Sequence, residues 1–234
     1  MKVAGSPFSD HERHPTQRLT ATGALAVSSN TAAIKVGQQL GSKTLYQYLT
    51  DFGFGKSTGS HLPGESAGLL RPVSDWSGTS LPTFSYGHGY SVTALQATSV
   101  FATIANNGVR VSPTVIAGTS DSSGNYTPSA TRESVRVISP ETAAQMRLMM
   151  ESVVSVNGTA PSAAIPGYRV AGKTGTAQRI DDTCGCYRGY TASFIGFAPA
   201  DKPAYVISVT IQDPKGMHWG GYLGGPVFKK VMSF

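Results

Sequence analysis

The sequence predicts a mixed α/β fold of the α+β type, with helices in the first two thirds of the chain and an antiparallel sheet after them. Two observations carry this prediction. Before residue 155, apolar residues recur at spacings of three and four, as they do on the buried face of a helix. After residue 167 the chain changes to short runs rich in β-branched and aromatic residues, separated by a tight Pro-containing turn, which indicates neighbouring strands.

Caps and helix breakers set the limits of the expected helices. Thr20 is a suitable N-cap for a short helix over 21–27, and Ser28-Ser29-Asn30 interrupts it because these residue types prefer caps and turns. The helix resumes over 31–40 and ends at Gly41. Further helices are expected at residues 43–52, 92–106, 139–154 and from 223 to the last residue.

The remaining segments are loops and strands. Residues 53–83 are rich in Gly, Ser and Pro but contain scattered apolar side chains, so we expect a long packed loop there. Residues 117–134 are expected to form an exposed hairpin. The strands are expected at residues 168–178, 191–198 and 204–212, which together form a three-stranded segment over 167–212.

The bulk composition argues against a nucleic-acid or membrane-spanning protein. The net charge is +6, but the basic residues are scattered, so no nucleic-acid surface is indicated. No apolar run approaches the length of a membrane span, and the first residues do not form a signal peptide. We therefore expect any export signal or anchor to lie outside this sequence. The last helix is still apolar at Phe234, so we also expect the chain to continue there.

Few residues offer a metal site. His11 and His14 share a polar loop with Asp10, but no further ligand is evident and no helix is expected there, so no metal is predicted. The two cysteines, Cys184 and Cys186, are separated by one glycine. They form either a small disulfide or two free thiols, and neither alternative gives them a catalytic role.

The triplet Lys173-Thr174-Gly175, followed by Thr176, is the most informative motif and falls on an expected strand. An extended peptide can pair with the edge of such a strand. The lysine offers a positive charge, the threonine hydroxyls can bind a substrate carboxylate, and the glycine permits close approach. The backbone N–H of Thr176 is positioned on the strand to provide half of an oxyanion hole.

Ser28-Ser29-Asn30 lies between two expected helices, where Ser28 can relay a proton and the Asn30 amide can hold a peptide carbonyl and a neighbouring lysine. Ser-x-Asn and Lys-Thr-Gly are two of the three motifs of β-lactam-binding serine acyltransferases. The third is Ser-x-x-Lys, which carries the nucleophile. It is absent, because no lysine of this sequence has a serine three positions before it.

These segments resemble the transpeptidase domain of class B penicillin-binding proteins, closest to the division-specific peptidoglycan synthases. Residues 28–30 are similar to the second family motif and residues 173–176 to the third. Residues 51–66, with Asp-Phe-Gly-Phe-Gly and Leu-Pro-Gly-Glu-Ser, resemble the segment after the second motif. Residues 86–96 resemble the Gly-x-Gly signature before a long helix. The cysteine pair is similar to versions from high-GC Gram-positive bacteria.

The resemblance implies a D,D-transpeptidase. A serine attacks the D-Ala-D-Ala stem peptide of peptidoglycan, and the acyl-enzyme is passed to an amine on a second strand; β-lactams acylate the same serine. The implied fold is that of penicillin-binding proteins and serine β-lactamases, a five-stranded antiparallel sheet between helical layers, with no metal or organic cofactor. The parent protein is expected to work with cell-division and cell-wall synthesis proteins. An N-terminal membrane helix would hold its catalytic domain at the extracytoplasmic face.

In this family the Ser-x-x-Lys motif should lie some tens of residues before Ser28, beyond Met1, together with the first two strands. Residues 1–234 are therefore interpreted as the C-terminal part of a single transpeptidase domain. We expect this part to be inactive alone and to be completed by the missing N-terminal part of the same protein.

Three alternatives remain open. A β-lactam sensor shares the motifs, although the blocks at 53–66 and 87–96 argue against it. A D,D-carboxypeptidase or β-lactamase uses water as acceptor and needs a deacylating base, for which Glu65 and Glu141 are the isolated candidates. A scaffold that has lost its nucleophile would bind without catalysis.

Overall fold

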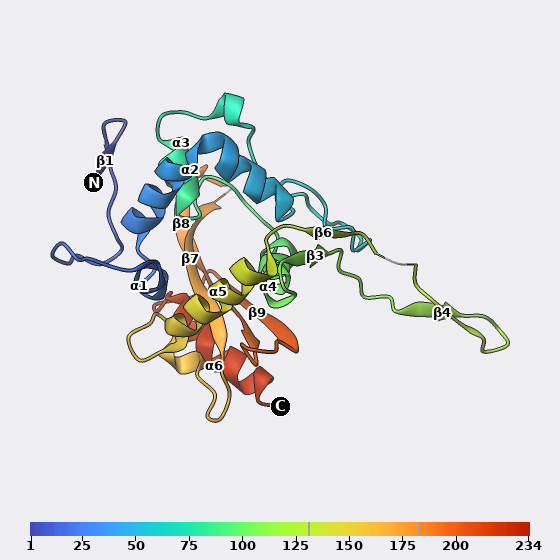
Figure 1. Ribbon diagram of the computed structural model, residues 1–234. Coiled ribbons are helices and arrows are strands. Elements are labelled where there is room, and N and C mark those ends of the chain that lie inside the picture. The colour runs from blue at the N-terminus through green and yellow to red at the C-terminus, as the bar shows by residue number, and fades with distance from the viewer. Residues whose placement is uncertain (131, 182) are drawn as a thin grey trace.

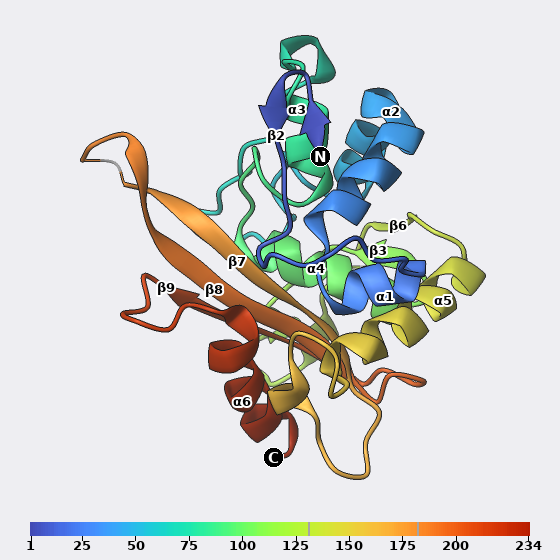
Figure 2. The same ribbon diagram turned by 90° about the vertical axis from the view of Figure 1, so that its left-hand side faces the viewer.

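The computed structural model describes residues 1–130, 132–181 and 183–234. Its central feature is a three-stranded antiparallel sheet of β7 (Ala171–Asp181), β8 (Cys186–Ala198) and β9 (Tyr205–Gln212), in that order. The sheet confirms the predicted three-stranded segment. The β7–β8 hairpin is longer than expected, because pairing continues past an irregularity between Gln178 and Ile180 and the hairpin projects from the body (Figure 2).

The first helix begins at the cap that the sequence predicts, and the second begins one residue before its expected start at residue 31. α1 (Ala21–Ala26) starts after Thr20, whose side chain accepts the N–H of Gly23. α2 (Asn30–Asp51) starts after Ser29 and changes direction at Gly41, which has φ 77° and ψ 162°. The predicted break at Gly41 is therefore a kink between two helical segments. The other helices are α3 (Ser80–Ser85), α4 (Ala94–Ala105), α5 (Pro140–Glu151) and α6 (Gly220–Met232).

The helices cover the two faces of the sheet differently, as Figure 2 shows. On one face, Phe228 of α6 packs edge-on against Phe194 of β8, with ring centroids 5.0 Å apart. On the other face, Phe197 of β8 packs with Ile104 of α4 and Met150 of α5. Alternate residues of β8 thus point to opposite faces and join both helical layers into one core.

The segment expected as a loop over 53–83 is more regular than predicted. It contains a 3₁₀ turn at Val73–Asp75 and the helix α3 near its end. The preceding part is held by Gln96 of α4, whose buried amide donates to the carbonyls of Lys56 (2.7 Å) and Ala67 (2.9 Å). Polar side-chain contacts with the backbone therefore replace regular secondary structure over this stretch.

Several short strands lie outside the central sheet. β1 (Lys2–Val3) pairs with β2 (Ser6–Pro7), and β3 (Val109–Val111) pairs with β6 (Ser134–Arg136). β4 (Gly118–Ser120) and β5 (Tyr126–Pro128) form a hairpin that extends far from the body (Figure 1). This hairpin confirms the expected exposed excursion, of which Thr131 lies outside the described residues. None of the helices in the described ranges has the length and apolarity that a bilayer crossing demands.

Candidate active site

The structure brings Lys173 and Ser28 together across 145 residues of sequence. The Lys173 ammonium, at the start of β7, donates a hydrogen bond of 2.7 Å to the Ser28 hydroxyl. Ser28 occupies the connection between α1 and α2 with φ 57°, a left-handed conformation that residues other than glycine seldom adopt. The tight turn between two helices therefore presents the Ser28 hydroxyl to the strand that carries the lysine.

The surroundings of Lys173 favour loss of its proton. Its ammonium donates to neutral oxygens, the Ser28 hydroxyl and the Thr174 carbonyl at 3.1 Å. Although part of the side chain reaches solvent, burial of the ammonium lowers the pKa of Lys173 from 10.5 to about 8. Burial penalises a charge that no anion compensates, so this lysine can exchange a proton with its neighbours near neutral pH.

The next residues of β7 present two hydroxyls beside the lysine. The Thr174 hydroxyl oxygen shares a hydrogen bond of 2.9 Å with that of Thr159 and lies 3.5 Å from the Lys173 nitrogen. The Thr176 hydroxyl accepts the N–H of Gly220 at 3.2 Å, which leaves its own proton free to donate. A carboxylate placed here would meet one positive charge and hydroxyl donors.

Gly175 allows β7 to pack against β8 with the present position of the Ser193 hydroxyl. It pairs with Ser193, and a Cβ at position 175 would lie 2.5 Å from the Ser193 hydroxyl oxygen. Within the described residues β7 is hydrogen-bonded to β8 alone, so its outer edge has backbone groups available for an added strand. The sequence predicted a strand at this triplet, and its free edge is what pairing with an extended peptide needs.

The other two residues of the Ser-x-Asn motif, Ser29 and Asn30, have different hydrogen-bond partners. Ser29 caps α2 by accepting the N–H of Ala32 at 3.1 Å. The Asn30 amide donates to the carbonyl of Ser9 at 3.1 Å, a backbone partner that the sequence did not predict. A peptide carbonyl, the partner expected for Asn30, would have to replace this contact.

Sequence reasoning missed a row of aromatic rings beside the site. Tyr190 of β8 stacks on His218 with ring centroids 4.0 Å apart, His218 contacts Trp219, and Trp219 contacts His11 of the N-terminal segment. Trp219 immediately precedes Gly220, the donor to Thr176. The only sign of these rings in the sequence was the His218-Trp219 pair before a helix, and this pair belongs to no recognised motif.

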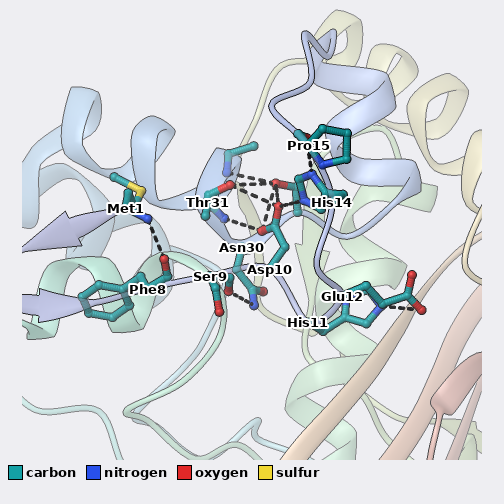
Figure 3. Close-up of polar contacts among 12 residues, drawn as sticks. Met1, Phe8, Ser9, Asp10, His11, Glu12, His14, Pro15, Asn30 and Thr31 are labelled. Carbon is teal, nitrogen blue, oxygen red and sulfur yellow. Dashed lines mark hydrogen bonds and ion pairs between the residues drawn. The ribbon is translucent and has the colours of Figure 1, made fainter.

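The cysteines and the N-terminal histidines, which the sequence offered as a possible disulfide and possible metal ligands, take up structural contacts. Cys184 and Cys186 form a disulfide in the turn between β7 and β8, which decides between the two alternatives left by the sequence. Among the described residues there is no cluster of three or more histidine, cysteine or acidic side chains that could hold a metal ion. His14 instead contacts the Asp10 carboxylate at 2.9 Å, and Asp10 also contacts the residues that follow Ser28 (Figure 3).

The fold and this arrangement define a member of the penicillin-binding protein transpeptidase family. The chain belongs to it, since the family described as "Penicillin binding protein transpeptidase domain" matches residues 1–233. Within the family, the chain is a class B transpeptidase domain similar to PBP3, FtsI and PbpB. The resemblance inferred from the motifs is confirmed, as is the fold class.

Individual relatives agree with this assignment. The penicillin-binding protein PbpB of Mycolicibacterium smegmatis is 41% identical over 99% of this chain and 37% of its own length. The peptidoglycan D,D-transpeptidase FtsI of Escherichia coli is 35% identical over 99% of this chain and 38% of its own. The crystal structure of apo PBP3 from Mycobacterium tuberculosis superposes with a TM-score of 0.94 at 38% identity, covering 100% of this chain and 55% of that one. The chain thus spans under two thirds of these relatives.

Proposed function

We propose that this chain is the part of a peptidoglycan D,D-transpeptidase that carries the second and third active-site motifs. The hydrogen bond between Lys173 and Ser28 is the observation that carries the proposal. In acyl transfer, a proton must leave the attacking hydroxyl and reach the leaving amine. Ser28 relays that proton, and Lys173, with its lowered pKa of about 8, holds Ser28 in place and supplies or accepts the proton as the reaction requires.

The substrate is a stem peptide ending in D-Ala-D-Ala, which lies as an added strand along the outer edge of β7. Its terminal carboxylate is bound by Lys173 and by the hydroxyls of Thr174 and Thr176. The lysine charge and the two hydroxyls, which belong to alternate residues on the same face of β7, support this assignment. β-Lactams bind the same place; the complexes of Mycobacterium tuberculosis PBP3 with aztreonam and with ampicillin support that step, at 38% identity to this chain.

The nucleophilic serine comes from a Ser-x-x-Lys segment outside these 234 residues. Two facts support this: the sequence contains no such motif, and 99% of this chain aligns with only 37% of the length of the Mycolicibacterium smegmatis relative. The complete protein acts at the extracytoplasmic face of the membrane, anchored by an N-terminal helix, together with proteins of division and cell-wall synthesis. Asn30 then exchanges its contact with the Ser9 carbonyl for substrate or for the lysine of the completing segment.

Labelling with a fluorescent penicillin, followed by a denaturing gel, tests the proposal. We expect the full-length gene product to label covalently and the 234-residue chain alone to remain unlabelled. In the full-length protein, Lys173→Met should slow labelling about a hundredfold or more, the range expected when a group in proton transfer is removed. Lys202→Met, which changes an exposed lysine in the turn between β8 and β9, is the matched control and should label normally.

Two results would contradict the proposal. Labelling of the 234-residue chain alone would mean that the nucleophile lies within it. Normal labelling of the Lys173→Met protein would remove Lys173 from the site.

A hydrolytic enzyme is the second candidate, and the position of the acidic residues disfavours it. The Glu65 carboxylate accepts hydrogen bonds from the hydroxyl and N–H of Thr58 (2.5 and 2.8 Å) and from the Ser60 hydroxyl (3.0 Å), and these donors lower its pKa. Glu141 lies in the first turn of α5, where its own backbone N–H and the Ser139 hydroxyl lower its pKa. Both are weak bases engaged in local structure. An acyl-enzyme that hydrolyses within seconds would favour the hydrolase.

A further inference from the structure

Asp10 lies on the irregular N-terminal segment and receives hydrogen bonds from residues on both sides of Asn30 (Figure 3). The Thr31 N–H donates to its Oδ1 at 2.8 Å, and the Thr31 hydroxyl donates to its Oδ2 at 3.2 Å. The Ser29 hydroxyl lies 3.0 and 3.2 Å from the two oxygens. The Asp10 side chain is 9% exposed, so these donors replace most of its water.

The residue before Asp10 completes the attachment. The carbonyl of Ser9 accepts the Asn30 amide at 3.1 Å, so residues 29, 30 and 31 are each bound to the dipeptide of Ser9 and Asp10 (Figure 3). Ser28 lies immediately before these three residues and keeps its left-handed φ of 57°. A non-glycine residue in that conformation persists only where its surroundings fix it, and the contacts of Ser29 and Thr31 with Asp10, on its C-terminal side, are such a restraint.

His14 holds the other side of the Asp10 carboxylate. Its Nε2 lies 2.9 Å from Asp10 Oδ2 and its Nδ1 lies 2.8 Å from the Pro15 carbonyl. A neutral imidazole has one N–H, so the ring donates to both the Asp10 carboxylate and the Pro15 carbonyl only in its protonated form. In agreement, the contacts with Pro15 and Asp10 raise the pKa of His14. Burial of Asp10 opposes its ionisation, but the donors of Thr31, His14 and Ser29 outweigh it and lower the pKa of Asp10.

We propose that Asp10 is a positioning residue that fixes the Ser28 hydroxyl toward Lys173 by binding residues 29 and 31 of the following helix start. This inference rests on the proposed function, in which Ser28 relays a proton. Asp10 touches neither substrate nor the reacting atoms. Its effect is on the geometry of the relay, because a catalytic group displaced by about 1 Å can slow a reaction on the order of a hundredfold.

Asp10→Asn in the full-length protein is the primary test. Asparagine keeps one oxygen for the Thr31 N–H, but its amide nitrogen cannot accept from the hydroxyls or from His14. With a fluorescent penicillin, the first-order acylation rate should fall about 10- to 100-fold while the constant for initial binding changes little. Asp121→Asn is the matched control: Asp121 accepts three comparable hydrogen bonds from Ser123 and Asn125 in the β4–β5 hairpin, far from the site, and its variant should acylate normally.

A milder pair of variants keeps the test valid if Asp10→Asn fails to fold. Thr31→Val deletes one hydroxyl that binds Asp10, and Thr31→Ser keeps it. We expect Thr31→Val to acylate more slowly and Thr31→Ser to restore the wild-type rate. In parallel, hydrogen exchange of the peptide over residues 24–34 should accelerate in Asp10→Asn, which reports the loosened turn independently of any reaction.

The possible results distinguish a failure of the positioning role of Asp10 from a failure of the proposed function. A wild-type protein that labels, with Asp10→Asn and Thr31→Val variants that acylate equally fast once folded, overturns the positioning role and leaves the proposed function intact. Slower acylation that the unfolded fraction fully explains overturns it as well. A full-length wild-type protein that does not label overturns the proposed function, and the catalytic meaning of Asp10 falls with it, whatever the exchange rates show.

Discussion

Lys173 combines two properties that conflict at neutral pH, a charge and a desolvated position. Its hydrogen bonds go to the Ser28 hydroxyl and a backbone carbonyl, which solvate an ammonium less well than water does. The folded protein therefore binds the proton of this lysine more weakly than the unfolded chain. In the absence of substrate, the desolvated ammonium therefore destabilises the folded protein. A substrate carboxylate that neutralises the ammonium would remove this destabilisation.

This conflict predicts how stability depends on pH. The pKa of Lys173 falls from 10.5 in the unfolded state to about 8 in the folded one, so between these values the unfolded state binds more protons and stability rises with pH. Compared with Lys173→Met, the 234-residue chain should gain on the order of 3 kcal/mol in the free energy of unfolding across that range. Urea titrations from pH 7.5 to 10.5 measure it. A stability difference between the wild-type chain and Lys173→Met that stays constant with pH would contradict the lowered pKa. Lys202→Met is the control, and its stability difference from the wild-type chain should not change with pH.

At the scale of elements, the approach of α6 to the sheet depends on glycines. All four glycines of α6 are buried: Gly220 and Gly224 lie against β8, whereas Gly221 and Gly225 lie against the segment over residues 159–163. A Cβ at Gly224 would lie 2.8 Å from the Cβ of Phe194 and 3.0 Å from its backbone nitrogen. The same close approach lets the Gly220 N–H reach Thr176, so helix packing and site geometry share one cause.

Gly224→Ala should therefore destabilise the protein. A single added methyl would have to displace the β8 backbone, and overpacking of this kind costs about 1–3 kcal/mol. Gly23→Ala is the matched control, because Gly23 is a helical glycine of α1 whose added Cβ would have ordinary contacts of 3.5 Å or more. We expect that substitution to be neutral or to stabilise by up to about 1 kcal/mol. Urea unfolding of the two variants tests this prediction, and the midpoint of Gly224→Ala should be the lower one. Equal midpoints would refute the packing argument.

The same elements show what sequence can and cannot provide. The cap at Thr20, the interruption at residues 28–30 and the break at Gly41 are local effects, and the structure contains all three, with α2 resuming at Asn30. The start of α6 was expected at residue 223, but the helix begins at Gly220, where packing on the sheet overrides the poor helix propensity of glycine. The Lys173–Ser28 pair was predictable through motif resemblance. The contact of Asp10 with Ser29 and Thr31 was not, because it depends on the path of an irregular segment through space.

At the scale of the whole molecule, the two motifs come from segments 145 residues apart in the sequence and meet where the helical layer of α1 and α2 borders β7 (Figure 2). The sheet has two outer strands in the described part of the chain, β7 and β9. Under the proposed function the β7 edge receives substrate. The β9 edge has no such occupant, and in the family fold further strands are expected to extend the sheet.

The β9 edge should make the 234-residue chain self-associate. An uncovered strand edge offers unpaired backbone N–H and C=O groups to a second molecule. Sedimentation of the 24.4 kDa chain at increasing concentration should give an average mass that rises above the monomer. Thr210→Lys, which places a charge on an exposed position of β9, should shift the chain toward monomer, whereas Ser123→Lys in the β4–β5 turn should not. The full-length protein should sediment without this association if its additional strands cover β9. If the 234-residue chain stays monomeric at about 100 μM, a concentration at which exposed strand edges associate, the prediction is wrong. The β9 edge would then be protected in some other way.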